Sequence, residues 1–289
     1  MARRGGMCLP DGAVLEHDGS FSCFLCCVAE CLNSAREGLA PPAVKGPLTE
    51  PGLFEERTVV ARDDARAGAV WRRLAAKAGE EAMLSCLAAF SSDLEGADEA
   101  AARLLARVWR EGGGALNDLS DAAVLLVEKA AVRTRAVAHL MKGLVRFSEL
   151  SDGSWYAGIA PDCDVLSFLG DHFQARFPSD RWAIHDRRRS SAIIHEPGSG
   201  WRLVMRFSLA SAAPGESALS RGATGRSRGE VPSVSLYSAA ELELRESWAA
   251  YHASVAISER VNPALQASHM PKKYWPDLPE MRRDDSARR

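Results

Sequence analysis

Two strand-like segments, Val145-Arg-Phe-Ser-Glu-Leu150 and Trp155-Tyr-Ala-Gly-Ile159, flank the polar sequence Ser151-Asp-Gly-Ser154. An Asp-Gly pair between two such segments is the strongest short-range signal for a β-hairpin. The segments predicted after this hairpin are a helix over 164–176 and strands over 181–186, 191–195 and 201–207. We therefore predict a β-β-α-β-β-β unit with a mostly antiparallel sheet.

The sequence before the hairpin predicts a largely helical part. Short strands are expected at 14–17 and 57–62, with a proline-rich loop over 36–56. The helices expected in this part cover about 21–33, 64–78, 80–91, 96–110 and 120–141. Near the C-terminus, a helix is predicted over 239–259, and Asn262-Pro263 fits a cap followed by proline at the first helical position.

These patterns predict an α+β fold, in which a helical N-terminal part packs with the sheet and the C-terminal helices close over it. We place the helical part at 13–142 and the sheet part with its C-terminal helices at 143–280. Residues 208–236 are rich in Ser, Gly, Ala and Arg without periodicity, which predicts a flexible insert. The charged end, 281–289, is expected to be a disordered tail.

The composition is that of an ordinary globular chain. It has 289 residues, of which 46% are hydrophobic and 26% charged. No apolar segment approaches the ~20 residues of a membrane helix, so we expect no membrane association. Seven cysteines without framework spacing indicate a reducing cytoplasm.

Four of the cysteines cluster near the N-terminus, at Cys23, Cys26, Cys27 and Cys31. This spacing puts them on one helix face, where a free cysteine behaves as a small buried hydrophobe. A Cys-x-x-Cys pair can also form a metal or redox site. We favour core packing and predict neither a metal nor a cofactor.

Charge is distributed unevenly along the chain. Residues 1–130 carry 14 Lys and Arg against 20 Asp and Glu, whereas residues 131–289 carry 22 against 18. This favours the second part for any phosphate-binding surface, although a solvated surface explains the same counts.

Three segments of the second part place cations beside apolar or aromatic side chains: His139–Phe147, Trp182–Arg189 and Met270–Trp275. Cations near exposed aromatics suit phosphates and unpaired bases. Each segment also has a structural alternative. The cations of the first could stabilise a helix C-terminus, those of the second could lie in a solvated turn, and the third could pack onto the body as a C-terminal clasp. The candidate nucleic-acid-binding residues are Lys142, Arg146, Arg187, Arg188, Arg260, Lys272, Lys273, Tyr274 and Trp275.

Signatures of well-known enzyme classes are absent from the sequence. It contains no phosphate-binding Gly-x4-Gly-Lys loop, no His-Glu-x-x-His, no Gly-x-Ser-x-Gly and no Gly-x-Gly-x-x-Gly. Whether the chain is an enzyme stays open. The candidate acid and base groups are His139, His172, His185 and Asp186. Because neighbouring strand residues face opposite ways, His185 and Asp186 are not expected to pair with each other.

Several motifs together resemble a family of DNA-metabolism or DNA-repair proteins encoded beside a radical SAM protein. They include Asp18-Gly-Ser-Phe21, His172-Phe-x-x-Arg-Phe-Pro178, Trp182-x-Ile-His-Asp186 and Met270-Pro-Lys-Lys-Tyr-Trp275. The resemblance covers about 13–280. In other proteins the same domain, of unknown function, precedes a uracil-DNA glycosylase-like domain.

The resemblance implies a DNA repair or modification accessory protein that binds DNA and works with a radical SAM partner. It supplies no catalytic residues. Two alternatives stay open: an enzyme that processes a nucleotide or base with His and Asp groups, and a protein-interaction adaptor without DNA contact. The adaptor predicts an exposed apolar patch.

Overall fold

The computed structural model describes residues 13–47, 49–53, 55–209, 219, 237–255 and 262–281. The chain forms two compact units, Met1–Arg135 and Ala136–Arg289. The sequence placed this boundary at the end of a helix, between 142 and 143. In the structure it falls inside that helix, α5 (Ala122–Leu144), which contributes its first turns to one unit and its last turns to the other.

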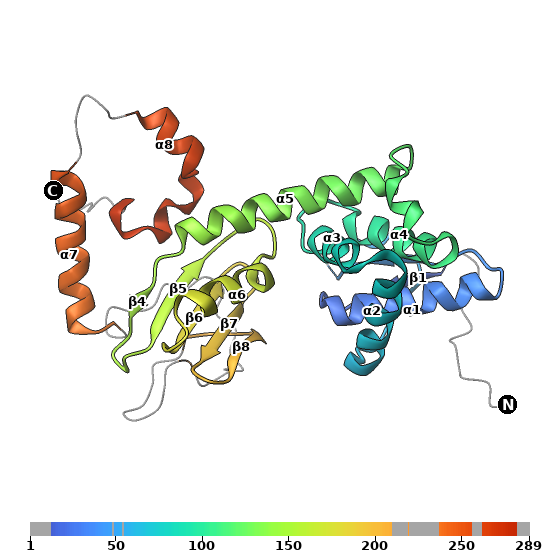
Figure 1. The fold of residues 1–289 in the computed structure, drawn as a ribbon, viewed down its shortest axis with the longest axis horizontal. Helices are drawn as coiled ribbons and strands as arrows, with labels where there is room; N and C mark the ends of the chain where they lie inside the picture. The colour runs from blue at the N-terminus through green and yellow to red at the C-terminus, as the bar shows by residue number, and fades with distance from the viewer. Residues whose placement is uncertain are drawn as a thin grey trace. The chain divides into compact units, whose positions relative to one another are not determined.

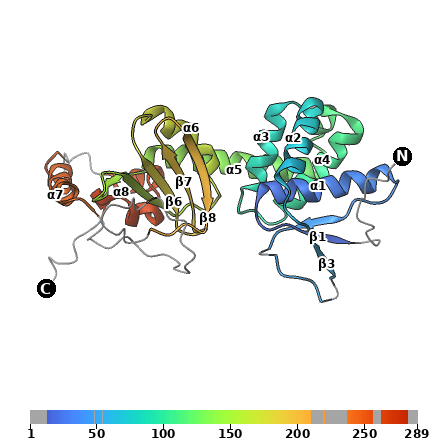
Figure 2. The same ribbon diagram turned by 90° about the horizontal axis from the view of Figure 1, so that it is seen from below.

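The first unit combines a small parallel sheet with helices (Figures 1 and 2). Its strand order is β2-β1-β3. The elements are β1 (Val14–Glu16), α1 (Phe21–Arg36), β2 (Ala43–Lys45), β3 (Arg57–Val59), α2 (Asp64–Ala78), α3 (Glu80–Phe90), α4 (Ala97–Glu111) and the 3-10 helix η1 (Gly113–Asn117). The three-residue strand β2 lies within the segment predicted as a loop, and its length explains why periodicity missed it.

Helix α1 is the centre of the first unit. The Ser20 side chain caps it by accepting from Cys23 N. Every residue from Cys23 to Leu32 is buried. Such a helix is covered on all sides, which here means the sheet and helices α2 and α4. Figure 2 shows the strands on one side of these helices.

The second unit contains a five-stranded sheet of order β4-β5-β6-β7-β8, with α6 across one face (Figure 1). Its elements are β4 (Ser148–Glu149), β5 (Trp155–Ile159), α6 (Leu166–Arg176), β6 (Trp182–Asp186), β7 (Ser191–Glu196) and β8 (Gly200–Met205). The C-terminal elements are α7 (Ala239–Ser254), α8 (Pro263–His269) and the 3-10 helices η4 (Lys272–Asp277) and η5 (Pro279–Met281). The α+β class and the β-β-α-β-β-β order are confirmed.

The prediction of a mostly antiparallel sheet was wrong. The sheet of the first unit is parallel throughout, and the second sheet is mixed because β5 pairs in parallel with β6. A helix between two neighbouring strands carries the chain back to the starting end, so the second strand runs in the same direction as the first. The sequence contained this helix, but the hairpins on either side dominated the prediction.

The two faces of the second sheet are both covered. Trp182 and Ile184 pack with Leu166 and Phe173 beneath α6. Ala183 faces the other way, into a cluster with Tyr156 and Phe207. The period of two along β6 thus separates two apolar layers.

The predicted helix starts and ends hold in part. Asn262 caps α8 with Pro263 in the first turn, as expected. Helix α5 continues through Gly143 to Leu144, because the bond from Val145 N to Met141 O (3.0 Å) closes a further turn. The described part of the predicted 239–259 helix ends at Ser254. Most of the insert at 208–236 and the tail after 281 lie outside the described residues.

Replacing either of two glycines of the second unit with alanine should change the stability of the protein, in opposite directions. A Cβ on Gly170 would lie 2.3 Å from a Trp201 ring atom, whereas a Cβ on Gly143 would have open space. We expect Gly170→Ala to lower the free energy of unfolding by about 1–3 kcal/mol through overpacking. Urea unfolding followed by circular dichroism measures the change.

Gly143→Ala is the matched control. Alanine reduces the entropy of the unfolded chain at a helical position that has room for it, so we expect an increase of up to about 1 kcal/mol. Equal effects of the two substitutions would contradict the packing of Trp201 on α6.

Candidate functional site

The two ends of the parallel pair β5–β6 carry the polar and aromatic side chains that could bind a ligand or take part in a reaction. Trp155 and Trp182 are register partners at one end, and Ile159 and Asp186 at the other. Partners on paired strands face the same side of the sheet. Both ends therefore present side chains on the face that α6 covers, about four residues, or ~13 Å, apart.

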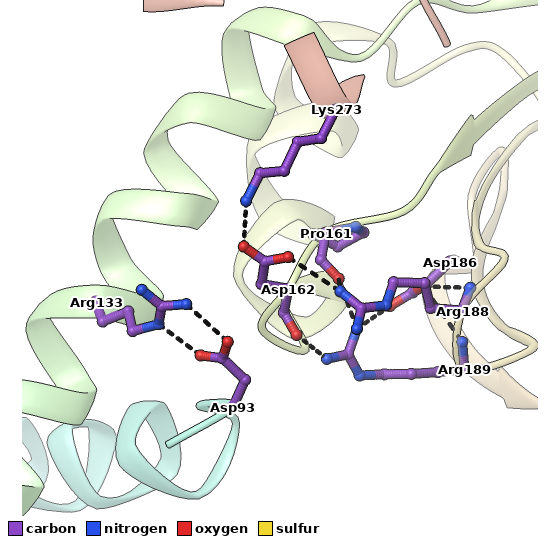
Figure 3. A network of polar contacts seen from close by, with 8 residues as sticks. All are labelled: Asp93, Arg133, Pro161, Asp162, Asp186, Arg188, Arg189 and Lys273. Atoms are coloured by element: carbon purple, nitrogen blue, oxygen red, sulfur yellow. Dashed lines mark hydrogen bonds and ion pairs between the residues drawn. The ribbon is translucent and has the colours of Figure 1, made fainter. Parts of the chain in front are cut away.

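An ion-pair network occupies the carboxyl end of the pair (Figure 3). Asp162 binds Arg188 Nη1 at 3.0 Å and pairs with Lys273. Arg189 Nη1 lies 2.7 Å from the carboxylate of Asp186 and also donates to the carbonyl oxygen of Asp162. Arg187 pairs with Asp277, and both side chains are largely buried. These contacts join the β6–β7 turn to η4.

This network engages the cations that the sequence assigned to nucleic acid. Arg187, Arg188 and Lys273 each have a carboxylate partner within the chain. A phosphate would have to compete with Asp162 or Asp277 for them. The arginine-rich turn therefore fastens the C-terminal segment to the sheet.

Asp186 is fully buried, and burial raises the pKa of its carboxyl group, against the opposing charge of Arg189. It also accepts from the backbone amides of Arg188 and Arg189, at 2.9 and 3.3 Å. Burial likewise raises the pKa of nearby Asp164. Carboxyl groups perturbed in this way occur both in active sites and in structural ion-pair networks.

The C-terminal aromatics support the clasp alternative. Tyr274 is 3% exposed and belongs to the core beneath α6, so it presents no free face for stacking on a base. Trp275 packs against the same core, and its indole Nε1 donates to Met270 O at 2.8 Å. Lys272 lies over the Trp275 ring, 5.8 Å from its centroid.

The candidate acid and base groups do not converge. His185 is buried on the face opposite α6, where its Nδ1 lies 2.9 Å from the hydroxyl oxygen of Tyr156. Asp186 points to the α6 side, as the strand alternation predicted. Among the described residues, no hydrogen bond joins any two of His139, His172, His185 and Asp186.

A separate group of cations lies where α5 and α6 end. Lys142 and His139 are exposed on the last turns of α5, and Arg146 donates to Gly143 O at 2.8 Å. The pKa of His172 is lowered by desolvation and then by the charges of Lys142 and Arg176. These two cations therefore lie within electrostatic range of one imidazole. Arg260 lies outside the described residues.

An aromatic pocket opens at the other end of the strand pair. Four aromatic residues and one aspartate line it: Phe147, Trp155, Phe177, Trp182 and Asp180. Its volume is about 190 Å³. This is smaller than the ~300 Å³ at which pockets for drug-sized ligands begin, and suits one flat ring system.

The pocket is held by contacts from every element around it. Phe147 meets Phe177 edge-on, with ring centroids 5.5 Å apart. The Trp182 indole donates to Phe177 O at 3.2 Å and is stacked on His195 at 5.0 Å. His195 Nδ1 lies 2.8 Å from Asp180 O. Because a carbonyl oxygen only accepts, this nitrogen carries the proton.

Arg176 lies beside this aromatic pocket. The Arg176 guanidinium lies 5.7 Å from the centroid of the Phe177 ring. Arg176 also acts on His172, together with Lys142. The cation group at the ends of α5 and α6 thus adjoins one ring of the pocket.

The residues that complete both ends of the strand pair were not predicted as site residues from the sequence. Trp155 was predicted only as part of a strand, and Asp180 and Asp277 were not considered. Asp162, which precedes the predicted helix over 164–176, binds Arg188 and Lys273. Trp155 lies beside Trp182 because β5 and β6 pair in parallel. Predicting that pairing from the helix between the two strands would have brought the two tryptophans together.

The N-terminal cysteines pack in the core, as favoured. Cys23, Cys26, Cys27 and Cys31 are all buried in the first unit. Burial raises the pKa of the Cys31 thiol to about 12. Within the described ranges, no group of three or more His, Cys, Asp or Glu side chains could hold a metal ion.

The model of a protein family described as a domain of unknown function, DUF4130, matches residues 95–280. The chain belongs to this family. The DUF4130 match starts just before α4 and extends through the sheet and the ion-pair network to η5. The aromatic pocket therefore lies in the DUF4130 region. No curated protein and no solved structure matches the chain.

No helix in the described part of this DUF4130 protein has the length and apolarity needed to cross a lipid bilayer.

The burial of His185 predicts a pH effect on stability. Desolvation, followed by the charge of Arg187, lowers the pKa of its imidazole from 6.5 to about 4. As the pH drops below about 6.5, the unfolded chain binds a proton at this imidazole, whereas the folded chain does so only near pH 4. The free energy of unfolding therefore falls as the pH drops from about 6.5 towards 4. We expect His185 to account for a loss of about 2 kcal/mol between pH 8 and pH 5, measured by urea unfolding.

His185→Gln removes the titration while offering Tyr156 an amide partner. The pH dependence of its stability should be flatter than that of the wild-type protein by this amount. His139→Gln makes the same substitution at an exposed position and serves as the matched control. An unchanged slope in His185→Gln would show that the imidazole is not buried as a neutral group.

Proposed function

We propose that the second unit binds an unpaired base of DNA in the aromatic pocket, with neighbouring phosphates contacted by cations at the ends of α5 and α6. The observation that carries the proposal is the pocket itself, in which four aromatic rings surround a space suited to one flat ring. Stacking on aromatic side chains contributes about 1–3 kcal/mol per base in single-strand binding.

The flanking charges favour a nucleotide over a cationic ligand. Aromatic rings also bind ammonium groups through cation–π attraction. Here, however, Arg176 lies beside the Phe177 ring, and Lys142 acts on the same imidazole as Arg176. Arg176 and Lys142 attract a phosphate outside the rings, whereas Asp180, which lines the pocket, attracts a hydrogen-bond donor or a positive charge. A base attached to a sugar-phosphate chain satisfies both the rings and the charges.

The proposal retains part of the surface expected from the sequence. Lys142 and Arg146 stay at the proposed interface, since Arg146 directly precedes the pocket residue Phe147. Arg187, Arg188 and Lys273 are engaged with carboxylates and are assigned to the fastening of η4. Tyr274 is assigned to the core.

The biological role that we propose is that of an accessory protein in DNA repair or modification, working with a radical SAM partner. The motif resemblance supports this role, and a base held outside a helix is what a base-modifying or repair system handles. The enzyme alternative lacks support, because the candidate His and Asp groups do not meet in one place.

A second candidate function, contact with a protein partner, is favoured by α7. Leu244, Trp248, Tyr251 and Val255 recur at helical spacing, and each is between 43% and 61% exposed. Trp248 and Tyr251 stack on each other with centroids 5.8 Å apart. Exposed aromatic clusters of this kind are typical of interface hot spots. We propose the radical SAM protein as the partner.

Binding of a fluorescein-labelled single-stranded decamer, measured by anisotropy, tests the base pocket. We expect Phe177→Leu or Trp155→Leu to raise the Kd about 5- to 150-fold, because a ring that stacks on the base is lost. The salt dependence of DNA binding by these two variants should equal that of the wild-type protein. Arg176→Ala or Lys142→Ala should instead lower the slope of log K against log salt by about one each, through loss of a phosphate contact.

Matched controls separate pocket effects from general ones. Tyr251→Leu removes an exposed ring from α7, and Lys273→Ala removes a cation that Asp162 already holds. Both should bind the decamer almost as the wild-type protein does. Absence of binding at low salt, or displacement of the decamer by millimolar tetramethylammonium at constant ionic strength, would contradict the proposal.

The α7 surface is tested by titrating a purified radical SAM protein of the kind that is encoded beside members of the family that the motifs resemble. Trp248→Ser should weaken the complex at least ~30-fold, as for a central hot spot. Leu265→Ser, which changes an exposed apolar residue of α8, should have little effect. A complex that forms equally well with both variants would exclude α7 as the contact.

A further inference from the structure

The aromatic pocket contains one polar side chain that stacking does not use. Asp180 lies between the end of α6 and the start of β6 and lines the pocket with the four rings. Among the residues that the structure describes, no hydrogen bond or ion pair engages its carboxylate. The nearest cation in sequence, Arg181, is bound by Glu196 at 2.7 Å.

The position of Asp180 is fixed by its neighbours. His195 donates to its carbonyl oxygen, and the same imidazole stacks on Trp182, a wall of the pocket. The next residue along, Arg181, accepts from Trp155 N at 2.9 Å, which ties the segment to a second wall. These contacts hold the backbone of Asp180 at the edge of the pocket, so this residue does not lie on a loose loop.

A carboxylate accepts hydrogen bonds and cannot donate them. A ligand in the pocket must therefore present donors at the edge that meets Asp180. Cytosine and adenine carry an exocyclic amino group, whereas thymine presents a carbonyl oxygen at the corresponding place. Opposed to a carboxylate, that oxygen leaves two acceptors facing each other, and the single donor of thymine, N3–H, lies between two carbonyl oxygens that both repel the carboxylate.

We propose that Asp180 makes the pocket selective for bases that carry an exocyclic amino group, and against thymine and uracil. This inference rests on the proposed function, because it requires a base in the pocket. It adds the identity of the base and the residue that selects it. Asp180 accepts from the amino group while the rings of Trp155 and Phe177 contact the faces of the base.

The test uses three fluorescein-labelled nonamers that are abasic except for one central cytosine, adenine or thymine. Anisotropy titrations with the full-length protein give a Kd for each. The wild-type protein should bind the cytosine and adenine strands about tenfold or more tighter than the thymine strand, as for a well-placed contact to a base edge. The abasic flanks keep other bases from competing for the pocket.

Asp180→Asn isolates the carboxylate. An amide both donates and accepts, so it satisfies thymine as well as cytosine. The ratio of the two Kd values should fall close to one, mainly through tighter binding of the thymine strand. Asp171→Asn is the matched control: this exposed carboxylate of α6 accepts from Trp201 Nε1 at 2.7 Å, outside the pocket, and the amide keeps an acceptor there.

The outcomes separate the two proposals. Binding of all three strands with equal Kd, weakened by Phe177→Leu, would overturn the selectivity and leave base binding intact. A preference that survives in Asp180→Asn would also overturn it, because another group would then select the base. If the wild-type protein unfolds cooperatively in urea, and is therefore folded, but binds none of the three strands, the proposed function is overturned and this inference with it.

Discussion

The second unit depends on the parallel pairing of β5 with β6. This pairing requires a crossover, and α6 supplies it, so one helix covers one face of both strands. The same register sets Trp155 beside Trp182 at the end where the strands start and aligns Ile159 with Asp186 where they finish. One backbone arrangement therefore generates an aromatic pocket at one end and an ion-pair network at the other.

The two ends use charge in different ways. At the carboxyl end, arginines and Lys273 meet aspartates within the chain, which joins a turn to a distant segment. At the pocket end, Arg176 lies beside an aromatic ring, and the Asp180 carboxylate has no partner in the described part of the chain. Positive charge in the sequence was therefore a poor guide to a binding surface; the presence or absence of an internal partner decides its use.

Local patterns predicted local structure well. The Asp-Gly turn and the start of α8 at Pro263 follow from chemistry within a few residues. Strand direction and the convergence of Trp155, Phe177 and Asp180 depend on pairing between segments far apart in the chain. The same limit explains why Tyr274 suggested stacking on a base: its burial is decided by the core that η4 meets, which no neighbouring residue reveals.

The buried cysteines of this protein can report when each unit opens, because they react only after they become exposed. Thiolate is the form that reacts with alkylating reagents, and burial keeps Cys31 and Cys86 protonated and covered. Both belong to the first unit, while buried Cys163 lies in the core of the second. The order in which these thiols become modified would therefore record which unit opens first, and how often, without any introduced label.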